Sequence, residues 1–242
     1  MVMKAIYLDE LTSTNTYLSL AVKNGTKKQE CYVVVDFQKE GKGQGDNSWH
    51  SNRKENLLTS VLLFPEFLSA SEQFGMAIVA SLAVCEVLEK YLKAMIKWPN
   101  DILVGNRKIA GILIENGIME NRVTHSIIGL GLNLNQDRFP PFPRKATSLF
   151  FETGVKCDPR EMADAFVVAL EGMEKRLEKG ERALLEEEYL EKFYLQGQAS
   201  DFESAEGIFR GTITGITPEG ELRIRGEDGM KSYGFSEVRF LE

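Results

Sequence analysis

The sequence predicts an α+β protein with a small β-barrel at its C-terminal end. Two observations lead to this prediction. Segments with helical and with strand-like spacing of apolar residues follow one another through the first 195 residues, whereas after Gly197 only short strand-like segments separated by turn residues remain. We therefore expect a large domain over residues 1–195 and a small one over residues 196–242, which leaves enough chain for a substantial core.

The first part of the chain is predicted to form three strands and two helices. Residues 5–8, 31–37 and 57–64 are rich in β-branched and aromatic side chains, which predicts strands. A helix is expected to start at Ser13, a hydroxyl residue suited to capping, and to stop at the next glycine. A second helix is predicted over residues 72–92, where apolar residues recur at intervals of three and four.

The rest of the chain is predicted to continue with strands, then helices, then the small barrel. The dipeptide Asp158-Pro159 is a strong helix start, because an N-cap carboxylate and a first-turn proline both favour that end of a helix. Predicted strands are residues 95–98, 102–104, 108–115 and 124–134, predicted helices are residues 158–177 and 182–195, and predicted barrel strands are residues 208–216, 222–224, 231–235 and 238–241.

Composition limits the classes of function. The formal charge is −7, which argues against a nucleic-acid-binding surface, and no run approaches the ~20 apolar residues of a membrane span. The N-terminus shows no signal-peptide pattern. Three scattered cysteines and two histidines argue against a disulfide framework and exclude a multi-histidine metal site, so we expect a cytoplasmic protein.

The segment Lys97-Trp98-Pro99-Asn100-Asp101-Ile102 is the strongest chemical motif. Pro99 restricts its own backbone and that of Trp98, so the segment is predicted to be a stiff strand end that enters a turn. Within it, Lys97 can neutralise a phosphate, Asn100 can hydrogen-bond a ribose or phosphate, and Asp101 can hold Mg²⁺ or orient a lysine. A simple turn beside a solvated lysine would explain a shorter motif better than it explains the whole hexapeptide.

A second lysine follows this hexapeptide at a short distance. Lys108 starts an apolar strand seven residues after Asp101, and strict alternation places Ala110 and Ile112 on its face. The small residues Ala110 and Gly111 let a ligand approach the backbone closely. A lysine beside such a surface suits an anionic ligand, whereas an ordinary lysine at a strand end is the simpler alternative.

A glycine-rich loop precedes both lysines. Residues 41–49 read GKGQGDNSW, and the backbone N–H groups of such a loop can surround an anion. The loop matches neither the P-loop nor the Rossmann pattern. A flexible hairpin is the alternative, but Lys42 and Trp49 add a cation for a phosphate and a ring for an apolar ligand.

Two polar segments complete the set of motifs. Ser13-Thr14-Asn15 can hydrogen-bond an amide-like or urea-like group, or simply cap a helix. Residues 129–135 read GLGLNLN, which combines glycines that admit close approach with Asn133, an asparagine that can meet a nucleotide. A β-bulge followed by a polar turn is the alternative for this second segment.

In this order and at these spacings, the segments resemble the biotin–protein ligase family of biotin–[acetyl-CoA-carboxylase] ligases. The likeness covers almost the whole chain, includes residues 145–149 (KATSL), and is specific, since KWPND is followed at the family's spacing by K-x-x-G-I-L. It implies a mixed β-sheet catalytic domain of the biotin/lipoate ligase type with an SH3-like C-terminal barrel. It also implies two steps: biotin and ATP give biotinyl-5′-AMP, and a lysine of the biotin carboxyl carrier protein then takes the biotin.

The resemblance assigns roles to individual residues. It implies that Lys108, Asp101 and Lys97 are catalytic and that Asp101 holds Mg²⁺. Binding of biotin, ATP and the adenylate is implied for a larger set: Ser13, Thr14, Asn15, Gln38, Lys42, Gly43, Gln44, Trp49, Asn100, Lys108, Gly111 and Asn133.

The glycine-rich loop departs from the family pattern. Lys42 stands where the family usually has arginine, and Asp46 stands where glycine is common. Lysine keeps the charge but loses the two-pronged hydrogen bonding of a guanidinium, so we expect looser retention of the intermediate. The stretch before Ser13 is too short for the helix-turn-helix of repressor relatives, so no DNA-binding role is expected.

Two alternatives remain at this point. A lipoate–protein ligase shares the fold and the adenylate chemistry but usually carries an R-R-x-S-G-G-G segment, which this sequence lacks. A biotin-binding module without turnover is the other alternative, although Lys97, Asp101 and Lys108 are all present. The carboxylase that is modified is left open, as is a homodimer, since edge strands allow two sheets to pair.

Overall fold

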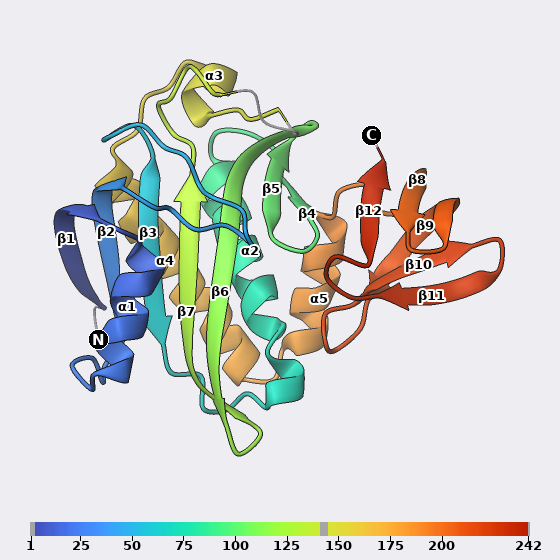
Figure 1. Ribbon diagram of the computed structural model, residues 1–242, viewed down its shortest axis with the longest axis horizontal. Coiled ribbons are helices and arrows are strands. Elements are labelled where there is room, and N and C mark those ends of the chain that lie inside the picture. The colour runs from blue at the N-terminus through green and yellow to red at the C-terminus, as the bar shows by residue number, and fades with distance from the viewer. Residues whose placement is uncertain (1–2, 141–144, 242) are drawn as a thin grey trace.

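The computed structural model describes residues 3–140 and 145–241, and Figure 1 shows a large mixed layer of helices and strands beside a smaller β unit. The strands of the large sheet are β1 (Lys4–Leu11), β2 (Cys31–Gln38), β3 (Leu57–Leu63), β4 (Met95–Lys97), β5 (Asp101–Val104), β6 (Arg107–Met119) and β7 (Arg122–Leu132). The helices are α1 (Thr14–Lys23), α2 (Gly75–Glu89), α3 (Leu149–Thr153), α4 (Pro159–Glu178) and α5 (Arg182–Glu191), with a 3₁₀ turn at Ala70–Glu72. The small sheet contains β8 (Ala199–Ser204), β9 (Gly207–Ile216), β10 (Leu222–Gly226), β11 (Gly229–Tyr233) and β12 (Val238–Leu241).

The large sheet is mixed and has the strand order β1-β2-β3-β7-β6-β5-β4. Strands β1 and β2 are parallel, which requires a crossover, and helix α1 supplies it. The other neighbouring pairs in this sheet are antiparallel. The small sheet is antiparallel in the order β11-β10-β9-β8-β12. The mixed sheet and the separate C-terminal β unit confirm the predicted fold class.

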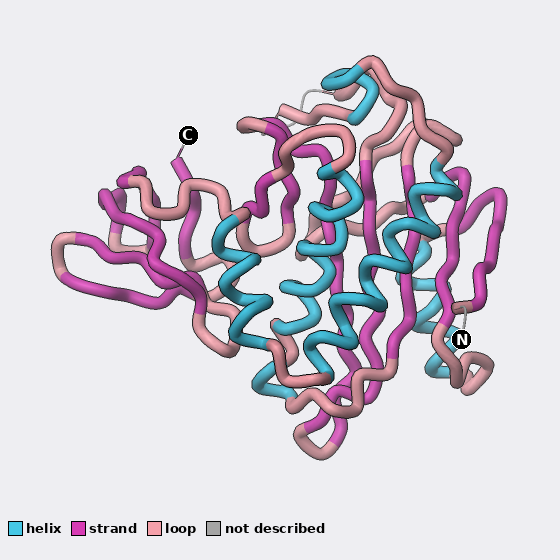
Figure 2. The backbone as a smooth tube through the Cα atoms, turned by 180° about the vertical axis from the view of Figure 1, so that it is seen from behind, coloured by secondary structure: helices cyan, strands magenta, loops and turns pink. Residues whose placement is uncertain are grey.

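Helices cover both faces of the large sheet. Helix α1 lies in front of the sheet in Figure 1, and Figure 2 shows α2, α4 and α5 across the opposite face. Alternate residues of β3 therefore enter two different clusters. Leu57, Val61 and Leu63 pack in the cluster that contains α2 and α4, whereas Leu58 and Leu62 pack in the cluster that contains α1. Every residue of β3 is buried for this reason.

Helix α2 is a core helix. Residues 70–89 form a helical segment that is long and apolar enough to cross a membrane by length and composition alone, although glutamates interrupt its apolar sequence. Its apolar window is 72% buried, because the sheet and helices α4 and α5 pack around it. Twelve residues between Gly75 and Leu88 are buried, which also explains why one apolar stripe does not describe this helix.

Helix α4 starts as predicted, whereas two shorter elements are not predicted by the sequence. The Asp158 carboxylate accepts from the N–H of Arg160 at 2.7 Å, and Pro159 is the first helical residue. Helix α3 and strand β8 are the unpredicted elements. In β8 (ASDFES) only Phe202 is buried. One large apolar side chain is too few to produce the alternation of apolar and polar residues from which a strand is predicted.

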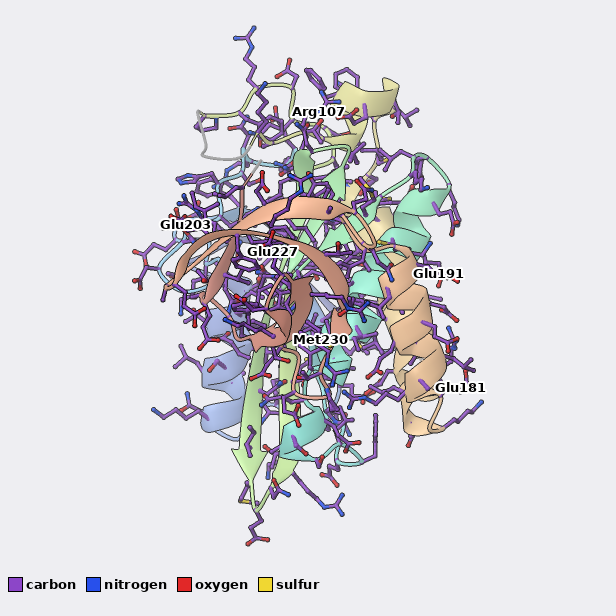
Figure 3. The ribbon with its side chains drawn as sticks, turned by 90° about the vertical axis from the view of Figure 1, so that its right-hand side faces the viewer. Arg107, Glu181, Glu191, Glu203, Glu227 and Met230 are labelled. Atoms are coloured by element: carbon purple, nitrogen blue, oxygen red, sulfur yellow. The ribbon has the colours of Figure 1, made fainter. Side chains whose placement is uncertain are left out.

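The small sheet packs against the end of β4 and the start of α2. The indole N–H of Trp98 donates to the backbone oxygen of Gly220 at 2.8 Å. The ring of Phe235 lies 5.3 Å from that of Trp98 and 6.3 Å from that of Phe74. Gly220 is required here, because its φ is +96° and a Cβ atom would lie 2.2 Å from the Phe74 ring. The apolar core is therefore continuous between the two sheets. Figure 3 faces this small sheet, with Glu227 and Met230 upon it and α5 alongside.

The carboxyl group of Glu174, on α4, lies half-buried among other acidic side chains. Burial, and then the charges of Glu30, Glu178 and Glu171, raise its pKa from the ordinary value of 4.5 to about 7. The folded state therefore binds this proton more tightly than the unfolded state. The resulting stabilisation is present below pH 4.5 and is lost as the pH rises through about 7.

We expect Glu174→Gln to raise the free energy of unfolding at pH 8 by on the order of 1–2 kcal/mol, because it removes a buried charge. At pH 4.5 the change should be close to zero. Urea unfolding at both pH values measures the effect, with Glu187→Gln on the exposed face of α5 as the control. A Glu174→Gln variant that is no more stable than the parent at pH 8 would contradict the assignment.

Candidate functional site

A polar cleft opens on the face of the large sheet that carries α1. Its cavity of about 180 Å³ is lined from α1, from the loop after β2, and from β3, β5, β6 and β7. The structure brings most of the predicted site residues together in this lining: Ser13, Thr14, Asn15, Gln38, Lys42, Gly43, Gln44, Trp49, Asn100, Asp101, Lys108 and Gly111. These residues come from segments far apart in the sequence, so the clustering is a property of the fold.

A β-bulge places Lys108 in the cleft. Ile109 has no partner on β5, because the residues on either side of it pair with adjacent residues of that strand. Ile109 and Ala110 are both fully buried in the cluster on the α2 side, so Lys108 emerges on the opposite face. The expectation that Lys108 shares a face with Ala110 and Ile112 is therefore wrong, since strict alternation does not hold across the bulge.

The ammonium of Lys108 is the centre of a charged end of the cleft. Its Nζ atom lies 2.5 Å from Asp101 Oδ1 and 5.5 Å from the centre of the Trp49 ring. A Cβ atom on Gly111 would lie 3.2 Å from the same Nζ atom, so the lysine side chain lies across this glycine. Asp101 and Gly111 are paired on β5 and β6, which explains why the carboxylate and the ammonium meet there.

Backbone hydrogen bonds fix both sides of this ion pair. The N–H of Lys108 donates to the oxygen of Lys145, and the N–H of Thr147 donates to the oxygen of Lys108, both at 2.9 Å. On the other side, the side-chain amide of Asn100 donates to the backbone oxygen of Ile112 at 2.9 Å. The N–H of Ile112 donates to the backbone oxygen of Asn100, also at 2.9 Å. These hydrogen bonds hold the backbone in place at Lys108 and next to Asp101, so the protein itself positions the two charged residues.

Two glycines make room for the Trp49 indole. Gly111 and Gly131 are opposite each other on β6 and β7. Cβ atoms at these positions would lie 3.0 Å and 2.3 Å from ring atoms of Trp49. Gly129 does the same for Asn15, whose Oδ1 would lie 2.2 Å from an added Cβ. The register is regular at these glycines, so they serve close approach rather than a bulge.

Uncharged hydrogen-bonding groups occupy the other end of the cleft. Gln38 Oε1 accepts from the N–H of Thr14 at 2.7 Å and from its hydroxyl at 3.0 Å. Ser60 Oγ lies 2.7 Å from Thr14 Oγ1 and 2.6 Å from Asn15 Oδ1. A hydroxyl carries one proton, so Ser60 donates to one of these at a time, and the other keeps its lone pairs for a ligand. The Asn15 amide donates to Glu115 at 2.7 Å.

Two serines contribute to this end of the cleft, Ser13 at its lining and Ser60 beneath it. Ser13 occupies the N-cap of α1, but its hydroxyl makes no capping hydrogen bond, so capping alone does not explain it. Ser60 is fully buried and was not predicted as a site residue. The sequence feature that indicates a role for Ser60 is the polar pair Thr59-Ser60 inside an otherwise apolar strand. Thr59 donates to the oxygen of Val33, and Ser60 faces α1.

The glycine-rich loop folds into a small hairpin at the cleft. The N–H of Gly43 donates to the oxygen of Asn47, and the N–H of Trp49 donates to the oxygen of Gly41, both at 2.8 Å. Gly45 adopts a φ of +60°, the left-handed region that favours glycine, and Asp46 does not. The tip of the hairpin therefore bends at Gly45, and Asp46 is exposed beside it.

Lys97 and Asn133 are predicted site residues that do not line the cleft. The Lys97 ammonium lies 4.7 Å from the centre of the Phe240 ring, on the small sheet. Asn133 is buried, and its amide donates to the oxygen of Thr147 at 2.9 Å. Its Oδ1 has no hydrogen-bond partner within the described part of the chain. The structure does not bring these two side chains to the others, so their predicted roles stay predictions.

The donor groups of the cleft fit a metal ion only if a substrate brings further ligands. Asp101 is the sole carboxylate among the described residues that line the cavity. Over residues 3–140 and 145–241, no three histidine, cysteine or acidic side chains gather closely enough to hold a metal. Mg²⁺ often binds to one or two carboxylates together with phosphate oxygens of a substrate. The cleft therefore fits Mg²⁺ that arrives with a phosphorylated ligand.

Known proteins are similar to this chain in sequence and architecture. Residues 7–133 match the biotin/lipoate A/B protein ligase family, and residues 202–241 match the biotin protein ligase C terminal domain. The bifunctional ligase/repressor BirA of Bacillus spizizenii is 32% identical over 235 residues, which cover 93% of this chain and 70% of that protein. The biotin–[acetyl-CoA-carboxylase] ligase of Paracoccus denitrificans is 26% identical over 219 residues, which cover 86% and 90% of the two chains.

A solved structure extends the likeness to three dimensions. The biotin protein ligase from Aquifex aeolicus, in complex with biotin and ATP, is 26% identical to this chain. It superimposes with a TM-score of 0.81 over 98% of this chain and 99% of the other. The similarity therefore includes the small C-terminal sheet as well as the large one.

We expect Gly131→Ala to displace the Trp49 indole and to lower the free energy of unfolding by about 1–3 kcal/mol, because the new methyl group would overlap the ring. Gly172→Ala in α4 is the matched control. It has open space around its Cβ position, so it should raise the free energy by up to ~1 kcal/mol. Urea unfolding measures both changes, and tryptophan fluorescence follows the indole. Equal stability of the parent and Gly131→Ala would contradict the close contact.

Proposed function

This chain belongs to the biotin/lipoate A/B protein ligase family, and from that premise we propose that it is a biotin–protein ligase that activates biotin with ATP and transfers it to a protein lysine. The observation that carries the proposal is the division of the cleft into two ends. Gln38, Thr14 and Asn15 form the neutral end, and the Lys108–Asp101 pair forms the charged end. Biotin has the same division, with a neutral ureido ring at one end and a carboxylate at the other.

The neutral end suits the ureido ring of biotin. That ring has two N–H donors and one carbonyl acceptor, and the side chains of Ser13, Thr14 and Asn15 offer hydroxyl and amide partners for both kinds of group. Their burial strengthens such bonds, because little water competes for them. The dithiolane ring of lipoate has no comparable polar groups and would leave these partners unsatisfied. The cleft therefore favours biotin over lipoate.

The charged end suits the adenylation step. One oxygen of the biotin carboxylate forms a bond to the α-phosphorus of ATP while the bond to the pyrophosphate oxygen breaks, and pyrophosphate leaves with the electron pair. Two anions must approach each other, so a cation between them lowers the barrier. Lys108 is positioned for this role, Asp101 orients its ammonium, and Lys42 adds a second positive charge from the loop.

The second step transfers biotin to the acceptor. The neutral amine of a lysine attacks the acyl carbon of biotinyl-5′-AMP, a carbon–nitrogen bond forms, the acyl–oxygen bond breaks, and AMP leaves with the electron pair. As the carbon–nitrogen bond forms, the nitrogen loses a proton, and Asp101, the carboxylate among the described residues that line the cleft, is placed to accept it. Lys108 then offsets the charge that develops on the departing phosphate.

Mg²⁺, a carrier protein and the cellular setting complete the proposal. Mg²⁺ would be held by Asp101 and by phosphate oxygens of ATP, and it would offset triphosphate charge. We propose the biotin carboxyl carrier protein of a biotin-dependent carboxylase as the acceptor, and the cytoplasm as the site of reaction.

A homodimer would pair through β1, the edge strand, since the backbone of Ile96 at the other edge already forms hydrogen bonds with the backbone of Lys192 and Tyr194.

The first test of the proposal is pyrophosphate release with purified protein, ATP and Mg²⁺. We expect release with biotin and only background release with lipoate. Lys108→Ala should lower the biotin-dependent rate at least a hundredfold, because it removes the cation between two anions. Lys39→Ala is the control, since this exposed lysine pairs with Glu10 outside the cleft. A protein that binds biotin but releases no pyrophosphate would be a binding module rather than a ligase.

The second test concerns the loop. We expect Lys42→Ala to raise the fraction of biotinyl-AMP that escapes before transfer, because the loop then lacks its cation over the adenylate phosphate. Single-turnover reactions, with free and bound adenylate separated by rapid filtration, measure this fraction. Lys39→Ala serves again as the control. Unchanged escape from Lys42→Ala would show that the loop lysine does not retain the intermediate.

A further inference from the structure

A second cavity adjoins the cleft and has a different chemical character. It measures about 190 Å³ and lies between α2, β6 and two turns of the small sheet. Gln44, Asn100 and Ile112 line both cavities, so the second one opens next to the Asp101–Lys108 pair. No step of adenylation described above uses it.

Half of the residues that line this second cavity are apolar, and two of them are the aromatic residues Phe74 and Phe235. The ring of Phe74 is buried, whereas Phe235 is 48% exposed and lies 6.3 Å from Phe74, ring centre to ring centre. Phe235 comes from the turn between β11 and β12, and Trp98 supports it at 5.3 Å. A half-exposed aromatic side chain held by two packed rings offers a preformed apolar surface to an entering side chain.

The two cavities differ in the charge of the residues that line them, so they suit different ligands. Among the described residues that line the second cavity, Glu219 alone is charged, and it is exposed in the turn between β9 and β10. The cleft, in contrast, contains Lys42 and Lys108. A cavity with an acidic group and no lysine or arginine in its lining repels the biotin carboxylate and the phosphates of ATP. It suits a cation on an apolar stem, which describes a lysine side chain.

We propose that the second cavity receives the acceptor lysine, an inference that rests on the proposed ligase function. The alkyl stem lies between Phe74 and Phe235, Glu219 attracts the ammonium during approach, and the amine passes Asn100 to reach the acyl carbon beside Lys108. The partner is a folded domain that presents an exposed lysine to the two turns of the small sheet. The C-terminal sheet thereby supplies part of the acceptor site.

Separate measurement of the two half-reactions tests this inference. Pyrophosphate release reports adenylation, and transfer of biotin from preformed biotinyl-AMP to a purified carboxyl carrier domain reports the second step. Glu219→Lys and Phe235→Ala should each lower kcat/KM for the carrier domain at least tenfold more than they lower pyrophosphate release. Glu221→Lys is the matched control, because it reverses an exposed charge in the same turn but does not line the cavity.

A small-molecule acceptor gives an independent readout. Aminolysis of the enzyme-bound adenylate by n-butylamine should be faster than aminolysis by methylamine, and Phe235→Ala should remove this preference for the longer stem. Glu219→Lys changes an exposed residue, so the test stands even if Phe235→Ala does not fold. Transfer at the parent rate by Glu219→Lys, or an equal loss in Glu221→Lys, would overturn the inference. Absence of biotin-dependent pyrophosphate release in the parent would instead contradict the proposed function.

Discussion

A lysine on the core-facing side of β6 would be buried among apolar side chains without a partner, at a cost of several kcal/mol. The bulge at Ile109 prevents this, because two consecutive residues face the core and Lys108 turns to the other side of the sheet. The backbone groups of Lys108 are satisfied by Lys145 and Thr147 from a neighbouring segment. One irregularity in one strand therefore creates the charged end of the cleft, and the ion pair with Asp101 depends on it.

The remaining features of the site follow from two-sided packing of the large sheet. Helices α2 and α4 exclude water from one face, and the other face combines an apolar patch under α1 with the open cleft. On the cleft face, the glycines of β6 and β7 remove side chains where Trp49 and Asn15 approach the strands. Each end of the cleft thus comes from different elements: α1 and β3 supply neutral hydrogen bonds, whereas β5 and β6 supply charge.

Sequence patterns predicted the element order well, because strong local signals marked most helices and strands. Asp158 and Pro159 fixed the start of α4, and the turn residues after Gly197 marked the small sheet. The patterns failed where tertiary context decides. The side of the sheet that Lys108 faces depends on an unpaired residue that alternation does not reveal. Ser60 supports the cleft residues Thr14 and Asn15 from beneath because α1 packs on β3, a contact between residues far apart in the chain.

We expect Lys108 and Asp101 to act as one unit at the charged end of the cleft. A double-mutant cycle on biotin-dependent pyrophosphate release, with Lys108→Ala, Asp101→Asn and the double variant, tests it most directly. We predict strong coupling: the double variant should be about as slow as Lys108→Ala alone, with an interaction energy above ~1.4 kcal/mol, or about tenfold in rate. Losses that simply multiply in the double variant would show that the two residues act independently and would contradict the account.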